Sequence, residues 1–293
     1  MPTQIELIKK HNLKIRGHLG QHLLIDPNLQ RKIVDLLELK PQDAVLEIGA
    51  GLGALTGEVL RRGVRVWAIE KEKSFIPILE QESAVYPKGR FHMIARDILE
   101  TDLQKTFEEM GAAKRPVKVL GNLPYYITAP ILFRLFDHPR EISRAVLTVQ
   151  KEVAQRMVAG PGTKDYGRLS LAVRYFTEAR LAFSIPPSCF TPRPEVDSAV
   201  VVLDFHGKPA AGGRVHEKLL FHLIESAFRQ RRKTLLHLLQ RDRLLKTSRQ
   251  ELEEIFKARG WSGTVRGEEL LLKDFISLAR IFQTKARGFK AVL

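Results

Sequence analysis

The chain has 293 residues, of which 44% are hydrophobic; this is enough for a sizeable core, excludes a disordered polymer and suggests two domains. The single cysteine, Cys189, excludes a disulfide framework, and the sequence shows neither a signal-peptide pattern nor an uncharged apolar run of about 18 residues, so we expect a cytoplasmic protein without a membrane span. The net charge is +15, and residues 207–293 alone carry 19 basic and 9 acidic side chains, which favours nucleic acid over a membrane surface as the partner.

Strands and helices alternate through the first half of the chain. An amphipathic helix is predicted over residues 26–39, where Asp26 and Pro27 supply an N-cap and a first-turn proline. Further strands and helices are predicted in turn, the strands at 44–48, 64–69, 91–95, 117–120 and 144–150, the helices at 54–62, 72–83, 128–136 and after the fifth strand through Met157. This alternation predicts an α/β domain with a parallel sheet and helices on both faces.

The pattern changes beyond residue 160. The stretch at 170–176 fits either a helix or a strand, whereas 178–185 and 198–205 both have strand character and predict a late antiparallel hairpin on a mostly parallel sheet. A linker-like composition follows at 206–213, and helical periodicity continues from 215 to the end. We therefore predict an α/β domain over 1–206 and a small, basic, all-helical domain over 207–293.

A glycine cluster follows the first predicted strand of the sheet, in "VLEIGAGLGALT" (45–56). Glycines such as Gly49 and Gly51 let the backbone turn sharply and approach a ligand closely. Gly53 comes too early for the dinucleotide fingerprint, and Glu47 would be poorly placed beside a pyrophosphate. The loop therefore favours a neutral or cationic nucleoside ligand.

Acidic residues end the next two predicted strands. Glu70 lies 19 residues after Gly51, where a carboxylate can accept hydrogen bonds from both hydroxyls of a ribose. Asp97 ends the third strand, where its carboxylate can accept a hydrogen bond from an adenine amino group. Either acid alone is most simply a solvated strand-end residue. Together with the glycine loop, they resemble the S-adenosylmethionine pocket of class I methyltransferases, which implies S-adenosylmethionine as the cofactor.

The stretch "GNLPYY" (121–126) resembles the N/D-P-P-Y motif of enzymes that methylate exocyclic amino groups of nucleobases. The lone pair of adenine N6 is delocalised into the ring, so two acceptors on its hydrogens favour a more nucleophilic nitrogen. The Asn122 side-chain oxygen and the Leu123 carbonyl would be that pair, Pro124 would fix the backbone, and Tyr125 would stack on the base. A structural turn is the alternative, because Asn-x-Pro is common in loops.

Further motifs extend the resemblance to nearly the whole chain, over residues 11–290. They are "LGQHLLID" (19–26), "VQKEVAQR" (149–156), "FTPRPEVDSAV" (190–200) and "AFRQRRKTL" (227–235). Their order is similar to that in ribosomal RNA adenine N6,N6-dimethyltransferases, above all the small-subunit members. Those enzymes modify two adjacent adenosines in the 3′-terminal hairpin of small-subunit rRNA. The resemblance implies a Rossmann-like class I methyltransferase fold, a small-subunit rRNA or assembly-intermediate substrate, and a monomer.

The resemblance also implies roles for individual residues. Phe190 would stack opposite Tyr125, so that the target base lies between two rings. The residues expected to contact the methyl donor are His22, Leu24, Gly49, Gly51, Glu70, Lys71, Asp97, Ile98 and Asn122. A basic cluster, expected on a helix, would contact RNA phosphates through Arg229, Arg231, Arg232 and Lys233. No His/Cys grouping has metal-ligand spacing, so no metal is expected.

One departure from the family pattern concerns the donor site. The family usually has "GQNFL" where this chain has "GQHLL", so His22 replaces a donor-contacting asparagine. An imidazole can still donate a hydrogen bond, but it is larger and titrates near neutral pH.

Three rival functions remain open. The first is a large-subunit rRNA methyltransferase of the macrolide-resistance type, against which the "QRRKTL" segment and the helical tail argue. The second is a non-catalytic RNA-binding assembly factor, against which the intact Asn122, Glu70 and Asp97 argue. The third is a small-molecule methyltransferase, which would leave the basic tail unexplained.

Overall fold

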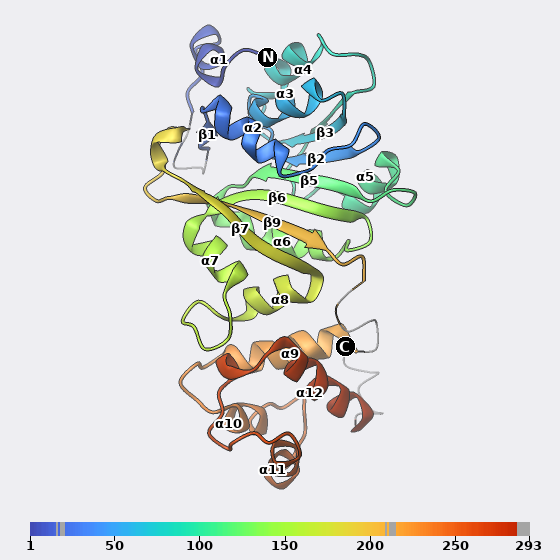
Figure 1. The fold of residues 1–293 in the computed structure, drawn as a ribbon, viewed down its shortest axis with the longest axis vertical. Helices are drawn as coiled ribbons and strands as arrows, with labels where there is room; N and C mark the ends of the chain where they lie inside the picture. Colours follow the sequence, from blue (N-terminus) through green and yellow to red (C-terminus); the bar gives the residue numbers. More distant parts are fainter. Residues whose placement is uncertain (16, 18–20, 209, 211–214, 286–293) are drawn as a thin grey trace. The chain divides into compact units, whose positions relative to one another are not determined.

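The computed structural model describes residues 1–15, 17, 21–208, 210 and 215–285, and the chain divides into two compact units (Figure 1). The first unit contains Met1–Ala154 and Thr177–Gly207, and the second contains Gln155–Phe176 and Lys208–Leu293. Among the described residues, no helix is both long and apolar enough to cross a membrane.

A seven-stranded sheet forms the centre of the first unit, in the order β4-β3-β2-β5-β6-β9-β7. Its strands are β2 (Ala44–Ile48), β3 (Arg65–Glu70), β4 (Phe91–Ala95), β5 (Val117–Asn122), β6 (Ile142–Gln150), β7 (Thr177–Ile185) and β9 (Ser198–Phe205). The strands from β2 to β6 pair in parallel, whereas β9 is antiparallel to both β6 and β7. The predicted mostly parallel sheet with a late antiparallel hairpin is therefore confirmed.

Helices alternate with the strands of the first unit as predicted, except that α5 (Leu103–Met110) was not among the predicted helices. They are α2 (Pro27–Asp35), α3 (Ala54–Arg61), α4 (Ile76–Ser83), α5, α6 (Thr128–Phe136) and the first turn of α7 (Lys151–Val158). Asp26 caps α2 by accepting from the backbone amides of Asn28 and Leu29. Apolar residues of α2 and α3 join those of β2, β3 and β5 in one core, which fixes these helices on the sheet.

The parallel strands bring their carboxyl ends to one edge of the sheet. Ile48 of β2 pairs with Ile69 of β3 and with Gly121 of β5, so the residues that follow each strand lie close together. The glycine loop begins at this edge. Gly49 and Gly51 have φ values of 72° and 58°, which side chains with a Cβ rarely adopt, so the loop requires glycine there.

A small second sheet joins two distant segments of the chain. Strand β1 (Leu23–Leu24) pairs antiparallel with β8 (Phe190–Thr191), in the register Leu24 to Phe190. The N-terminal segment is further held by α1 (Gln4–Lys10), whose Leu7 packs with Leu23 and with residues of the glycine loop and α4. This pairing places His22 beside the proline-rich segment that follows β8.

The second unit is helical. It comprises the end of α7, α8 (Arg168–Phe176), α9 (Glu217–Phe228), α10 (Leu235–Gln240), α11 (Arg249–Ala258) and α12 (Leu272–Lys285). The predicted boundary after residue 206 needs a correction, because residues 155–176 belong to this unit. The cause is the buried face of α8, where the Phe176 ring stacks on Phe221 of α9 at 5.9 Å and the Tyr175 hydroxyl bonds Glu217.

Candidate functional site

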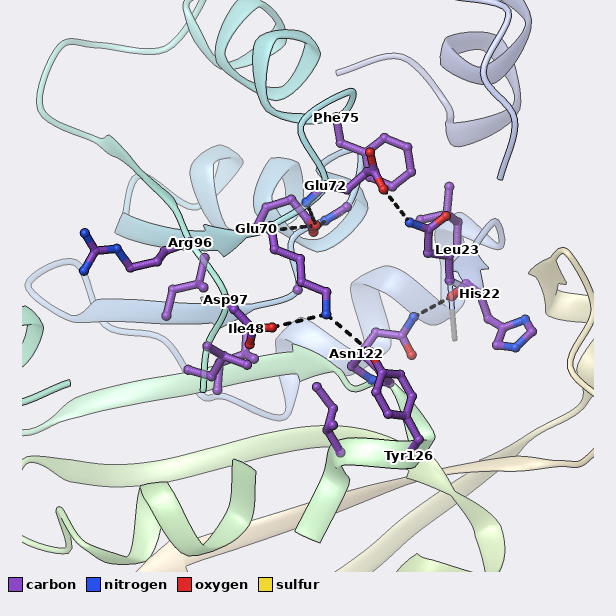
Figure 2. Close-up of a pocket in the computed structure, with 18 residues that line it drawn as sticks. His22, Leu23, Ile48, Glu70, Glu72, Phe75, Arg96, Asp97, Asn122 and Tyr126 are labelled. Carbon is purple, nitrogen blue, oxygen red and sulfur yellow. Dashed lines mark hydrogen bonds and ion pairs between the residues drawn. The ribbon is translucent and has the colours of Figure 1, made fainter. Parts of the chain in front are cut away.

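A pocket of about 190 Å³ opens at the carboxyl ends of β2, β3 and β5 (Figure 2). The residues predicted to contact a methyl donor that line it are His22, Gly49, Gly51, Glu70, Lys71, Asp97, Ile98 and Asn122. They come from five separate stretches of sequence, and the parallel sheet brings them together. Their contacts with a donor stay a prediction, while their common location is a property of the fold.

The Glu70 carboxylate accepts hydrogen bonds from three backbone amides at the pocket. Its Oε2 accepts from the amide of Gly51 at 2.7 Å, and its Oε1 accepts from the amides of Lys71 and Glu72 at 2.9 and 2.8 Å. Burial raises the pKa of Glu70, although these amide hydrogen bonds act in the opposite direction. One carboxylate thus ties the glycine loop to the turn after β3 and still has lone pairs for ribose hydroxyls.

The Lys71 ammonium lies between Asp97 and Tyr126, which both line the pocket. Its Nζ lies 3.2 Å from Asp97 Oδ2 and 3.3 Å from the Tyr126 hydroxyl. Burial lowers the pKa of Lys71, but its bonds with Tyr126 and Asp97 outweigh this and leave the pKa above its ordinary value. The other oxygen of Asp97 accepts from the amide of Leu99 at 2.8 Å. An adenine amino group that binds Asp97 must therefore share the carboxylate with the Lys71 ammonium.

The Asn122 amide has its orientation fixed by the backbone. Its Nδ2 donates to the carbonyl oxygen of His22 at 2.7 Å. A carbonyl can only accept, so the amide nitrogen must face His22 and the Oδ1 acceptor must face the other way. Among the residues that the structure describes, none donates to the Leu123 carbonyl. Within the described part of the chain, the Asn122 Oδ1 likewise accepts from no residue, so two acceptors without a donor belong to consecutive residues, as recognition of an amino group requires.

The remaining residues of the motif differ in their exposure to the pocket. Pro124 lines it, whereas the Leu123 side chain is buried and the Tyr125 ring is not part of the pocket wall. The Tyr125 hydroxyl shares a 2.6 Å hydrogen bond with Ser198 Oγ at the start of β9. Burial raises the pKa of Tyr125, and the bond with Ser198 only partly offsets this. The phenol is therefore neutral near pH 7, which suits a stacking surface and not a base.

The structure places Phe190 and Leu24 in the core instead of at a ligand. Phe190 is 2% exposed and Leu24 is 1% exposed, and both belong to the cluster that includes Ile185 and Val200. In this conformation Phe190 does not face Tyr125, and Leu24 does not line the pocket. The pairing of β1 with β8 explains both differences, because it turns these two side chains into the same apolar layer.

The ring that stacks on Tyr125 belongs to His22. The two ring centroids are 5.7 Å apart, with 24° between the ring planes. The imidazole Nδ1 lies 2.8 Å from the carbonyl oxygen of Pro192, so Nδ1 carries the proton in this contact. Figure 2 shows the imidazole directed away from Asn122, Glu70 and Asp97. The part of His22 that reaches the pocket is therefore its carbonyl group.

Glu47 lies beneath the glycine loop and outside the pocket lining. It is 1% exposed, its Oε2 accepts from the Thr56 hydroxyl at 2.5 Å, and burial raises its pKa to about 8. The carboxyl is therefore mostly protonated at neutral pH. It acts as a buried hydrogen-bonding group of the fold and not as an anionic ligand contact.

Glu47→Gln is expected to change how stability depends on pH. The folded-state pKa is raised, so the stabilising contribution of Glu47 is complete below its unfolded pKa and is lost as the pH rises through about 8. Glutamine stays neutral and can still accept from Thr56. In thermal unfolding from pH 5 to 9, the Tm of the variant should rise relative to the Tm of the wild type as the pH increases. A difference in Tm that stays constant across this range would contradict the assignment.

Comparisons with known proteins agree with this arrangement. A model of the family described as ribosomal RNA adenine dimethylase matches residues 12–261. The chain belongs to the ribosomal RNA adenine dimethylase family. It is also 40% identical over 283 residues to a ribosomal RNA small subunit methyltransferase A of Lachnoclostridium phytofermentans, a match that covers 97% of each chain.

Two solved structures show the same fold. A dimethyladenosine transferase from Plasmodium falciparum aligns with a TM-score of 0.73 and 26% identity, covering 90% of this chain and 98% of that one. The 23S rRNA methyltransferase ErmE aligns with a TM-score of 0.65 and 24% identity, covering 89% of this chain and 98% of its own, which shows the fold alone.

The predicted basic cluster of this family member lies between helices and not on one. Residues 229–234 connect α9 to α10, because Thr234 caps a new helix. All four side chains are exposed, but Arg231 also has a structural role. Its guanidinium donates to the carbonyls of Lys164 and Tyr166 at 2.5 and 2.7 Å, within the same unit.

Several lining residues were absent from the predicted site. They are Gln21, Leu23, Ile48, Ile69, Glu72, Phe75, Arg96, Tyr126 and Ile127, whereas Pro124, which also lines the pocket, was predicted as a catalytic residue. Most lie next to predicted residues, so adjacency was the available signal: Tyr126 follows Tyr125, and Arg96 precedes Asp97. Sequence alone does not show which neighbour of a strand-end residue points inward.

Proposed function

We propose that this protein transfers methyl groups from S-adenosylmethionine to N6 of two adjacent adenosines in the 3′-terminal hairpin of small-subunit rRNA. The observation that carries the proposal is the fixed Asn122 amide: its oxygen and the adjacent Leu123 carbonyl accept from none of the residues that the structure describes. The similarity to the ribosomal RNA small subunit methyltransferase A of Lachnoclostridium phytofermentans supports the choice of the small subunit.

The pocket residues fit S-adenosylmethionine. Its sulfonium would supply an electrophilic methyl group. Glu70 offers carboxylate lone pairs for the ribose, Asp97 offers an acceptor for the adenine amino group, and Gly49 and Gly51 leave the backbone bare for close approach. Carboxylates at this position also suit a ligand that carries positive charge.

The residues of the chain would prepare the nitrogen and position it. The Asn122 oxygen and the Leu123 carbonyl accept the two N6 hydrogens, which localises the nitrogen lone pair and points it toward the donor. Pro124, with φ −59° and ψ 129°, holds the second carbonyl in place. Tyr125 offers a flat neutral surface for an extruded base. No strong base is needed, because the sulfonium loses its charge during transfer.

Methyl transfer to ribosomal subunits tests this proposal. Unmodified small subunits, with large subunits in parallel, are incubated with labelled S-adenosylmethionine, and the digested RNA is read by mass spectrometry. We expect N6,N6-dimethyladenosine from small subunits only. Label in large-subunit RNA would select the resistance-type alternative. Tight RNA binding without transfer to either subunit would indicate a non-catalytic assembly factor.

We further propose that the substrate is an assembly intermediate and that the protein acts as a monomer in the cytoplasm. The basic second unit supports this, because it offers the rRNA a surface that a partner subunit would otherwise supply. Sedimentation of the protein alone and with immature small subunits would test it. A stable dimer of the free protein would contradict it.

Exposed cations of the connection between α9 and α10 should govern RNA affinity. Replacing Arg229, Arg232 and Lys233 together by alanine is expected to raise KM for small subunits about tenfold or more and to flatten its salt dependence by about one unit of log–log slope per lost phosphate contact. Steady-state kinetics between 50 and about 200 mM salt measure both effects.

Arg231→Ala is the matched control for this experiment. Because Arg231 bonds main-chain carbonyls of its own unit, its loss should lower Tm and leave the salt slope nearly unchanged. A salt slope that changes with Arg231 and not with Arg229, Arg232 and Lys233 would reverse the assignment.

A further inference from the structure

His22 touches three parts of the proposed base site. Its ring stacks on Tyr125, its Nδ1 donates to the Pro192 carbonyl, and its own carbonyl accepts from Asn122. Gly17 lies near the ring edge, where an added Cβ would make ordinary van der Waals contact with His22 Cε1 at 3.6 Å and with the Pro192 Cβ at 3.4 Å. The stacking on Tyr125 and the hydrogen bond to Pro192 therefore define the position of the imidazole.

The distance between the two rings excludes a base between them. Stacked carbon atoms are separated by about 3.5–4 Å, so two rings that enclose a third lie about 7–8 Å apart. The His22 and Tyr125 centroids are only 5.7 Å apart. A base that stacks on this face of Tyr125 must take the place of the imidazole.

We propose that the His22 imidazole is a displaceable placeholder for the target adenine, a positioning residue that covers Tyr125 until the base enters. The inference rests on the proposed function, in which Tyr125 is the stacking surface. Like a base, the imidazole is a flat ring with an N–H donor, so it can stack on Tyr125 and bond the Pro192 carbonyl at the same time. The entering adenine replaces the ring, which must leave Tyr125 and release the Pro192 carbonyl. Asn122 is unaffected, because it is held by the His22 main chain.

This role differs from that of a donor ligand. The donor-contacting residues Glu70 and Asp97 lie on the side of the pocket from which the imidazole is turned away (Figure 2). Removing the ring should therefore leave donor affinity unchanged and act on the RNA substrate alone. A donor ligand would show the opposite behaviour.

Kinetics of His22→Ala separate these two roles. Because a covered site lowers apparent affinity by the fraction of open molecules, the variant should lower KM for small subunits about three- to tenfold. The values of kcat and of the donor Kd should stay within about twofold of the wild type, because the main-chain carbonyl that holds Asn122 is retained. His92→Ala is the matched control, since His92 stacks on Trp67 at 4.1 Å outside the pocket. A raised KM, or a weakened donor Kd, in His22→Ala alone would overturn the proposal.

A second measurement does not depend on methyl transfer. The Cε1–H signal of His22, assigned with His22→Asn, should be displaced by the ring current of Tyr125 in histidine-labelled protein. An RNA hairpin with two adjacent unpaired adenosines should move this signal to an exposed position, whereas the same hairpin with uridines, or the donor alone, should not. No response, or an equal response to both hairpins, would overturn the proposal even if methylation occurs. A response specific to adenosine without any methyl transfer would instead count against the proposed function alone.

Discussion

Asn122→Ala is expected to lower kcat by about 10²- to 10³-fold, the usual loss when one preorganised hydrogen-bonding group of a transition state is removed. The alanine leaves N6 with a single acceptor, so the lone pair stays delocalised in the adenine ring. Donor affinity and KM for small subunits should change much less, because Glu70, Asp97 and the basic cluster are untouched. Single-turnover methylation with saturating small subunits, together with donor calorimetry, separates these quantities.

Asn122→Asp tests the orientation of the amide more sharply. The aspartate keeps an acceptor oxygen of the same size, but it replaces the donor that faces the His22 carbonyl by a second acceptor. Two acceptors repel each other at this distance, so the side chain should rotate and kcat should fall about as far as in the alanine variant. Wild-type kcat in Asn122→Asp would mean that the His22 carbonyl does not set the acceptor geometry.

The sequence was sufficient for most of the site because its residues follow directly after strands. Parallel strands gather their carboxyl ends at one edge, so the glycine loop, Glu70, Asp97 and Asn122 had to meet once the alternation of strands and helices was recognised. Local patterns also sufficed for the late antiparallel hairpin.

Long-range pairing explains what the sequence did not reveal. Leu24 and Phe190 are buried because a two-residue strand near the N-terminus pairs with another about 170 residues later, and segments this short carry no periodic signal. The direction of the His22 ring depends on the same pairing. In the second unit, α8 is amphipathic, but the sequence does not say which element its apolar face will meet.

The surroundings of individual side chains also could not be predicted from the sequence. Arg231 has the composition of an RNA contact, and only the fold shows its guanidinium bound to main-chain oxygens. Glu47 has the position of a ligand contact, and only its burial shows that it is a neutral group of the core. In both cases the residue type was informative and its surroundings decided its role.

Glu70→Ala is expected to weaken donor binding by about 10²-fold or more, because hydrogen bonds to a charged group contribute about 1.5–3 kcal/mol each. The carboxylate bonds the amides of Gly51, Lys71 and Glu72, so its removal loosens the glycine loop as well as the proposed ribose contact. Glu70→Gln should bind the donor only slightly more tightly than Glu70→Ala. Its single acceptor oxygen cannot accept both from the Gly51 amide and from the amides of Lys71 and Glu72. Calorimetric titration with S-adenosylmethionine measures these affinities.

The pH dependence of donor affinity distinguishes the carboxylate from a merely structural side chain. Burial raises the pKa of Glu70, so the wild-type protein should lose affinity on acidification at a higher pH than an exposed glutamate would cause. This loss should be absent from Glu70→Gln. Glu80→Gln, which changes an exposed carboxylate of α4 outside the pocket, should behave as the wild type in both affinity and pH profile. If Glu70→Gln keeps full affinity and the same profile as the wild type, the ionised carboxylate is not what holds the donor, and the contact must come from the loop that Glu70 supports.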